Sequence, residues 1–215
     1  MRTGMTDPSG EDRAALRRRM RSARRRLAPA EQRRAAEAAA AQLARLGLPR
    51  PRSRVAFYLP MDGELDPGPA MLRALRRGCE VFVPVITAFR ARHMRFVRWT
   101  PELATRRNRW GIREPEGAGI DGRWLDLAVV PCVAFDASGT RLGLGAGFFD
   151  RHFAWLAGRG AWRRPRLIGL AHEFQHVDRL HRADWDVPLW GVVTDRDVYG
   201  RAAGFLRPTP REASE

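Results

Sequence analysis

The sequence predicts a single α/β domain of three layers, in which a mainly parallel, Rossmann-like sheet is covered by helices on both faces. Strand-like apolar segments alternate along the chain with helical ones, which is the order that produces a parallel sheet. The length of 215 residues and the 44% apolar composition fit one domain with a sizeable core. We expect residues 1–11 to form a disordered tail, 12–204 the domain and 205–215 a C-terminal tail.

Two helices are predicted at the start of the domain. From Asp12 onward, apolar residues recur at helical spacing, at Leu16, Met20, Ala23 and Leu27. A second, alanine-rich helix begins at Pro29, because proline is favoured in a first turn, and it ends before Gly47.

The strands are predicted from short apolar runs at 54–59, 80–85, 94–99, 125–135, 166–171 and 189–194. Short helices are expected to end at Arg77 and to cover 148–157. Prolines and glycines interrupt the pattern at 60–67 and 108–122, so both segments are predicted to be loops. Because ligands bind beyond the carboxyl ends of parallel strands, we expect the loops 60–67 and 139–150 to form the site.

Composition excludes several classes of protein. No apolar run approaches the roughly 20 residues that span a bilayer. The amino terminus lacks the apolar region of a secretory signal, so we expect a cytoplasmic protein with no membrane partner. Cys79 and Cys132 show no CxxC pairing and are predicted to be buried thiols.

The charge balance leaves a second class open. The net charge is +15, and all 39 basic residues are arginine. A positive field attracts any polyanion, including nucleotides, a polyglutamylated cofactor or RNA. An arginine-rich RNA-binding protein on an enzyme-like fold is therefore the alternative function, although the chain shows no RNP-like aromatic strand, KH loop or zinc knuckle.

The most informative stretch is residues 139–151, GTRLGLGAGFFDR. Its three glycines at alternate positions allow backbone N–H groups to approach a bulky anion, and the following helix adds its positive end. Arg141 offers a guanidinium to phosphate, and Asp150 offers an oxygen ligand to Mg²⁺. The pattern is neither GxGxxG nor a Walker sequence, so a purely structural turn remains an alternative.

Two further groups have a functional and a structural interpretation. Glu64 and Asp66 follow a predicted strand, where a carboxylate binds a donor-rich ring or simply decorates an exposed turn. Arg13 and Arg17 share one helix face, where they form a fork for phosphate oxygens or a solvated surface.

Two other patterns suggest metal ligands. Asp184 or Asp186, before the last predicted strand, could face the glycine loop and help bind a metal ion, or belong to a turn. His172 and His176 satisfy the zincin pattern HExxH, which requires a helix. Because the motif ends a strand-like run containing Gly169, we interpret it as a chance match.

Taken together, these motifs resemble the 5-formyltetrahydrofolate cyclo-ligase family, also called 5,10-methenyltetrahydrofolate synthetases. The resemblance runs from about Arg13 to Thr194 and is most specific at 130–136 and 141–151. Supporting pieces are RxxLR at 13–17, YLPMDGE at 58–64, NRWGIREP at 108–115, GLAHEFQ at 169–175, and Asp186 followed by VVT at 192–194.

The resemblance implies a NagB/RpiA/CoA transferase-like fold and an ATP-driven ligase of one-carbon metabolism. In this reaction 5-formyltetrahydrofolate and MgATP give 5,10-methenyltetrahydrofolate, ADP and phosphate. The implied substrate is a folate with or without a polyglutamate tail, and the implied cofactors are ATP and Mg²⁺. We expect a monomer without a nucleic-acid partner.

The resemblance also implies roles for individual residues. ATP would be held by Arg13, Arg17, Arg141, Leu142, Gly143, Leu144, Gly145, Ala146, Gly147, Phe148 and Phe149. The folate would be bound by Leu59, Glu64, Leu144, Gly145, Ala146, Gly147 and Phe148, and Mg²⁺ by Asp150 and Asp186. The expected catalytic residues are Arg141, Glu64 and Asp150, with Arg141 stabilising the charge that develops during phosphoryl transfer.

Three positions depart from the family pattern. Arg13 stands where lysine is usual, so a planar fork replaces a point charge. Ala146 stands where glycine or lysine is common and limits positive φ angles. Phe149 replaces a tyrosine and removes a hydroxyl group. None of these changes removes a carboxylate, so an active enzyme is predicted.

Overall fold

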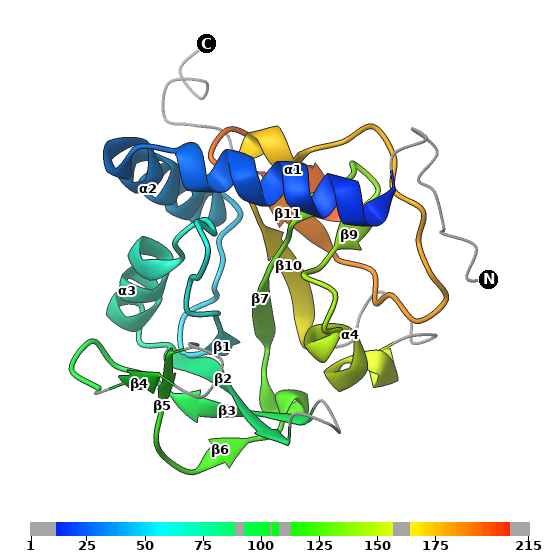
Figure 1. Cartoon of the computed structure of the whole chain (residues 1–215). Helices are drawn as coiled ribbons and strands as arrows, with labels where there is room; N and C mark the ends of the chain where they lie inside the picture. Colours follow the sequence, from blue (N-terminus) through cyan, green and yellow to red (C-terminus); the bar gives the residue numbers. More distant parts are fainter. Residues whose placement is uncertain (1–11, 89–92, 104, 108–112, 157–163, 207–215) are drawn as a thin grey trace.

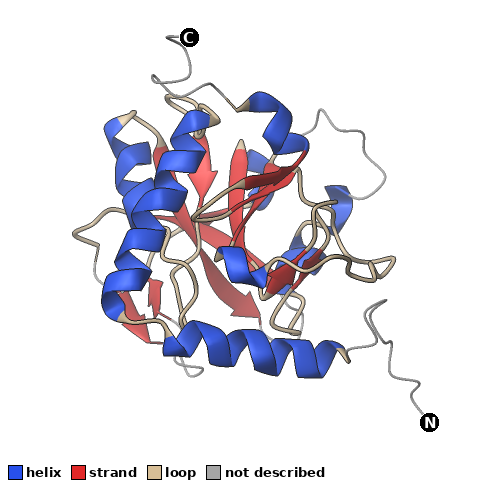
Figure 2. Ribbon diagram, turned by 90° about the horizontal axis from the view of Figure 1, so that it is seen from above, coloured by secondary structure: helices blue, strands red, loops and turns tan. Residues whose placement is uncertain are grey.

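The computed structural model describes residues 12–88, 93–103, 105–107, 113–156 and 164–206. An eight-stranded sheet forms the middle layer of one α/β domain. Helices α2 (Pro29–Arg45) and α3 (Gly68–Arg76) cover one face, and α4 (Phe148–His152) lies on the other, as Figures 1 and 2 show. The predicted three-layer class is confirmed.

Five parallel strands form the centre of the sheet, and antiparallel strands form its edges. The order is β12 (Val198–Gly200), β11 (Gly191–Val193), β10 (Arg166–Leu170), β7 (Leu127–Pro131), β1 (Arg54–Ala56), β2 (Glu80–Ala88), β3 (His93–Arg98) and β6 (Gly119–Ile120). In register, Val55 of β1 lies opposite Val81 of β2 and Leu127 of β7. All six strand segments predicted from apolar runs contribute to this sheet.

Alternate residues of each central strand enter two separate cores, because side chains of a strand point to opposite faces. Val55 and Val129 pack with the alanine-rich faces of α2 and α3. Ala56 and Val130 pack on the opposite face with Phe153, which follows α4. Both faces are therefore covered, as expected for parallel strands.

Helix α1 (Arg13–Arg26) belongs to neither face. It begins where the Asp12 carboxylate accepts a hydrogen bond from the Ala14 N–H at 3.2 Å. Its buried residues Leu16 and Met20 pack with Leu142 on the hairpin formed by β8 (Ala134–Phe135) and β9 (Arg141–Leu142). The helix consequently lies across the end of the sheet where β7 and β10 terminate (Figure 1).

The segment 125–135 was expected to be one strand but divides into β7 and β8. The buried Gln175 amide donates hydrogen bonds to the carbonyl oxygens of Cys132 and Val133, at 2.8 and 2.7 Å. These carbonyls are thus satisfied outside any ladder, and the chain turns away from the sheet. As a result the glycine loop follows the β8–β9 hairpin and not a central parallel strand.

Other predicted elements also differ. The helix expected at 148–157 is only α4, five residues long, followed by a 3₁₀ turn at Ala154–Leu156. The expected loop 108–122 contains the strands β5 (Arg113–Pro115) and β6, and β5 pairs with β4 (Thr105–Arg107). Residues 108–112 of the predicted motif, both expected tails except 205–206, and Ala157 lie outside the described residues.

Three further 3₁₀ turns are found at Gly122–Trp124, Glu173–Gln175 and Arg201–Phe205. No helix in the described ranges is long and apolar enough to cross a membrane.

Candidate active site

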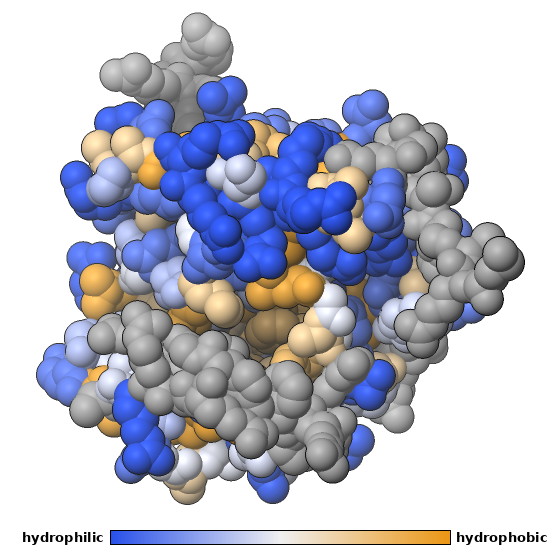
Figure 3. Space-filling model, viewed as in Figure 1, coloured by the Kyte–Doolittle hydropathy of each residue, from blue (hydrophilic) through white to orange (hydrophobic). Residues whose placement is uncertain are grey.

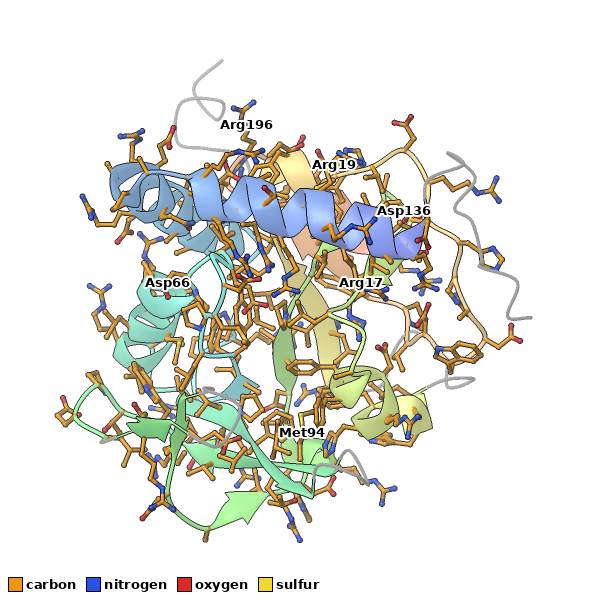
Figure 4. All side chains as sticks on the ribbon, viewed as in Figure 1. Arg17, Arg19, Asp66, Met94, Asp136 and Arg196 are labelled. Atoms are coloured by element: carbon orange, nitrogen blue, oxygen red, sulfur yellow. The ribbon has the colours of Figure 1, made fainter. Side chains whose placement is uncertain are left out.

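An apolar pocket opens at the carboxyl ends of β1 and β7. After β1 the chain continues to β2 on one side, and after β7 it continues to β10 on the other side. Ligands of α/β sheets bind at such a switch point. The walls come from the loop after β1, the ends of β2, β3 and β7, and the glycine loop. Figure 3 shows apolar surface below the hydrophilic band along α1, and Figure 4 places Met94 low in this region.

Glu64 supplies a carboxylate to this apolar pocket and is only 6% exposed. The turn that precedes it folds the side chain back, because the Met61 N–H donates to Glu64 Oε2 at 3.1 Å and the Glu64 N–H donates to the Met61 carbonyl at 3.0 Å. Burial raises the pKa of Glu64 to about 7, while the neighbouring charge of Arg24 opposes the shift. The carboxylate therefore changes charge near neutral pH.

The glycine loop is held at its start by a buried carboxylate. Asp136 accepts hydrogen bonds from the N–H groups of Ser138, Thr140 and Leu180, at 2.9, 3.1 and 2.9 Å. Beyond β9, Gly145 has a φ of 104°, a conformation that side chains rarely permit. A Cβ there would lie 3.8 Å from the guanidinium of Arg17, so the loop also passes close to α1.

A charged cleft of about 790 Å³ lies on the other side of this loop. Arg13 and Arg17 enter it from α1, and the Arg17 Nε–H donates to the Gly143 carbonyl at 2.9 Å (Figure 4). Burial and the charge of Arg13 lower the pKa of Arg17, as expected for two guanidinium groups held side by side. Asp150 and the 184–186 turn also line the cleft. Asp186 forms an ion pair with Arg13, in which Oδ2 lies 3.6 Å from Nη2.

The apolar pocket and the charged cleft share Gly143, Gly147 and Asp150. Arg141, 5% exposed and lining the apolar pocket, donates through Nη2 to Asp150 Oδ1 at 2.6 Å. Asp150 also accepts a hydrogen bond from the Val187 N–H at 3.3 Å. A cation and an anion are thus fixed at the boundary, where a group bound in one space would meet a group bound in the other.

Comparisons with known proteins show the family of the chain. A family model described as the 5-formyltetrahydrofolate cyclo-ligase family matches residues 9–195. The 5-formyltetrahydrofolate cyclo-ligase of Escherichia coli (strain K12) is 34% identical over 188 residues, which cover 84% of this chain and 98% of the relative. The chain belongs to the 5-formyltetrahydrofolate cyclo-ligase family. It is accordingly an enzyme, a ligase.

Solved structures named as synthetases share the fold of this cyclo-ligase family member. The 5,10-methenyltetrahydrofolate synthetase of Aquifex aeolicus has a TM-score of 0.71 and 30% identity, covering 87% of this chain and 92% of that one. The synthetase of Mycoplasma pneumoniae has a TM-score of 0.66 and 23% identity, covering 86% and 100%, and supports the fold alone.

The residues singled out from the family resemblance separate into two groups in space. The apolar pocket is lined by Leu59, Glu64, Arg141, Gly143, Leu144, Ala146, Gly147, Phe148, Phe149 and Asp150. The charged cleft is lined by Arg13, Arg17, Gly143, Gly145, Gly147, Asp150 and Asp186. Leu142 lines neither space, because it is fully buried against Leu16 and Met20. Gly145 lines the cleft and not the apolar pocket.

Among the lining residues, Glu114, Trp185 and Cys132 were not predicted from the sequence to belong to the site. Glu114 is a third carboxylate on the apolar pocket, beside Glu64 and Asp150, and accepts a hydrogen bond from the Ile86 N–H at 2.9 Å. Trp185 is 69% exposed on the charged cleft. Cys132 also lines the apolar pocket, where burial raises the pKa of its thiol to about 12. Their signal was position alone, since Cys132 lies within the predicted strand 125–135 and Glu114 and Trp185 lie between predicted strands.

The HExxH residues do not form the helical face that a zinc hydrolase needs. Residues 173–175 form a 3₁₀ turn, and the His172 ring nitrogen Nε2 lies 3.3 Å from the Gly63 carbonyl. His176 instead stacks on Phe135, with ring centroids 5.3 Å apart. Within the described ranges, no group of three potential metal-binding His, Cys, Asp or Glu side chains is found.

Proposed function

We propose that this enzyme closes the ring of 5-formyltetrahydrofolate in an ATP-dependent reaction that yields 5,10-methenyltetrahydrofolate, ADP and phosphate. The observation that carries the proposal is the shared wall between the apolar pocket and the charged cleft. A flat pterin ring suits the apolar pocket, and a triphosphate suits the arginine-lined cleft. The formyl group and the γ-phosphate would then meet beside Arg141 and Asp150.

The chemistry explains why both spaces are required. A formamide carbon is a weak electrophile, and its oxygen is a poor leaving group. Transfer of the γ-phosphoryl group to that oxygen breaks the bond to ADP and converts the oxygen into part of a phosphate ester. N10 then attacks the carbon, the carbon–oxygen bond breaks with release of phosphate, and N10 loses its proton. The protein contributes position and charge neutralisation.

The charged residues of the cleft suit the nucleotide. Arg13 and Arg17 present two guanidinium groups from one face of α1, and the backbone of the glycine loop faces them. We assign phosphate binding to these groups, and the neutralisation of transferring charge to Arg141. The loop residues 144–148 and Leu59 would contact the folate. Glu64 would accept hydrogen bonds from the donor-rich pyrimidine edge of the folate's pterin ring.

The oxygen ligands of the cleft suit Mg²⁺. Asp150 and Asp186 come from different segments, line the same cleft and are each balanced by an arginine. Mg²⁺ in nucleotide sites commonly takes one or two carboxylates, with phosphate oxygens and water completing its shell. Asp150 and Asp186 would hold the ion, which would supply charge neutralisation to the bound phosphates.

The departures from the family pattern leave this arrangement intact. Arg13 reaches the cleft and pairs with Asp186, so the fork replaces lysine without loss of charge. Phe149 lines the apolar pocket, where the hydroxyl of a tyrosine is absent. Neither change removes a carboxylate from the two spaces, so we expect a working enzyme that lacks a hydroxyl group at position 149.

The test is near-ultraviolet absorbance after the whole protein is mixed with 5-formyltetrahydrofolate, Mg²⁺ and ATP. The methenyl product has an extended amidinium chromophore that the substrate lacks, so an ATP-dependent rise is expected. An Asp150→Ala variant should abolish the rise while retaining the wild-type circular dichroism spectrum. Absence of a rise with folded wild-type protein that binds ATP would overturn the proposal.

A further inference from the structure

Arg24 is a buried arginine behind the apolar pocket. It follows Leu16 and Met20 on the inner face of α1 and is 0% exposed. The loop after β1 packs directly on it, because a Cβ at Gly63 would lie 2.9 Å from the Arg24 carbonyl carbon and oxygen. The Arg24 backbone is therefore in close contact with this loop, and the guanidinium lies beside two of its carboxylates, those of Asp62 and Glu64.

The contacts of this guanidinium are incomplete. Nη2 lies 3.5 Å from Asp62 Oδ2, and Nη1 lies 3.9 Å from Glu64 Oε1. The Nε and Nη1 atoms have no hydrogen-bond partner within the described ranges. A buried charge with unfilled donors costs several kcal/mol, on the order of what its ion pairs return, so an apolar side chain of the same size would be no less stable. Packing alone does not account for an arginine here.

The two carboxylates beside Arg24, those of Asp62 and Glu64, differ in the number of other arginines that contact them. Asp62 also accepts hydrogen bonds from Arg21 and Arg25, and these outweigh burial and hold its pKa below the usual range. Arg24 makes the one ion pair found for Glu64 among the described residues. If Arg24 were replaced by an uncharged residue, Asp62 would still contact Arg21 and Arg25, whereas Glu64 would lose its nearby cation.

The remaining groups around Glu64 do not replace that cation. Burial raises the pKa of both Tyr58 and Cys132, and burial lowers the pKa of His172, so all three stay neutral near pH 7. The other charged groups that act on Glu64 are Arg21, which favours its ionised form, and Asp62, which opposes it. Arg24 is the larger favourable influence.

We propose that Arg24 is a positioning residue, which favours the ionised form of the Glu64 carboxylate and holds it aimed into the apolar pocket. The inference rests on the proposed function, in which the Glu64 carboxylate accepts hydrogen bonds from the pterin. Arg24 does not line the pocket, so it acts through Glu64 and not on the substrate. A neutral Glu64 would present a donor where the pyrimidine edge of the pterin also presents donors.

Arg24→Met tests the proposal, since methionine fills similar space without charge. A cation within about 4–6 Å shifts a carboxyl pKa by roughly 1–3 units. We therefore expect the acid limb of the kcat/KM profile to move up by about one pH unit, with retained thermal stability. Arg24→Lys should return the limb toward wild type. Arg25→Met, which removes a partner of Asp62 with a 60% exposed side chain, is the matched control and should leave the limb in place.

A direct measurement separates this inference from the proposed reaction. Titration of the Glu64 side-chain carboxyl by ¹³C NMR in the whole protein requires no turnover. An upward shift of about one unit in Arg24→Met, absent in Arg25→Met, supports the inference even if wild-type protein proves inactive. An unchanged Glu64 titration, or loss of folding in Arg24→Met that Arg24→Lys does not repair, would overturn it.

Discussion

Arg141 donates a 2.6 Å hydrogen bond to Asp150 across the boundary between the apolar pocket and the charged cleft. Arg141 is held by β9, whose pairing with Phe135 of β8 fixes its backbone. Asp150 is held by the Val187 N–H as well as by Arg141. Both charges are thus oriented before any phosphate arrives, and such preorganisation is what stabilises a transition state.

Replacing Arg141 by alanine should reduce turnover by at least about 100-fold, because the charge that develops between the two spaces loses its nearest guanidinium. Binding of 5-formyltetrahydrofolate should change much less, since apolar walls dominate the pocket. Turnover from product absorbance and stability from urea unfolding should be measured together. Wild-type turnover in a folded Arg141→Ala protein would contradict the assignment.

Turnover should require Mg²⁺ bound by Asp150 and Asp186. Chelation should abolish turnover, and added Mg²⁺ should restore it, because phosphoryl transfer from ATP needs charge neutralisation. Asp186→Asn should raise the half-saturating Mg²⁺ concentration by about 10-fold or more, since an amide is a weaker ligand. Asp184→Asn is the control from the same turn, where the side chain is exposed. Equal Mg²⁺ requirements in the two variants would remove Asp186 from the metal site.

The parts of the site that follow predicted strands were accessible from the sequence. Glu64 comes after β1, as the rule for parallel strands predicted, but the glycine loop was predicted to follow the strand at 125–135 and instead follows the β8–β9 hairpin. Helical spacing also predicted α1, but its place over the hairpin depends on Leu16 and Met20 finding Leu142. That contact is tertiary, and no local pattern contains it.

Arg24 shows a different limit of sequence interpretation. It lies four residues after Met20 and so falls on the buried face, but the dense arginines around it hide that position. Its burial depends on the close approach of Gly63, which requires a φ of 72° in a loop far along the chain. The hairpin that interrupts the expected strand at 125–135 likewise depends on Gln175, more than 40 residues later.

Trp185 should report nucleotide binding. Its indole is 69% exposed on the cleft that we assign to ATP, so a bound nucleotide would cover it and shift its emission to shorter wavelength. The chain contains 7 tryptophans, so the difference between wild type and Trp185→Phe isolates this signal. Trp124, 65% exposed and on neither space, provides the matched control through Trp124→Phe. An ATP response that survives in Trp185→Phe would place the nucleotide elsewhere.

Glu64 should make stability depend on pH in a defined direction. Burial raises its pKa from 4.5 to about 7, so the folded state retains a proton that the unfolded state releases. This contribution is fully present below about pH 4.5 and is lost as pH rises through about 7. Glu64→Gln has no such proton, so wild type should lose up to about 3 kcal/mol relative to Glu64→Gln across this range.

The comparison isolates Glu64 because Arg24 stays charged at every pH tested. At low pH both proteins place a neutral side chain beside Arg24, and the attraction between Arg24 and ionised Glu64 is already included in the pKa of about 7. What remains is the difference between neutral Glu and Gln, which does not change with pH and displaces the two stability curves by a fixed amount. Urea unfolding of both proteins at intervals from pH 4 to pH 8 gives the difference directly. A difference that stays constant, or that moves in favour of wild type as pH rises, would show that burial does not raise the pKa of the Glu64 carboxyl.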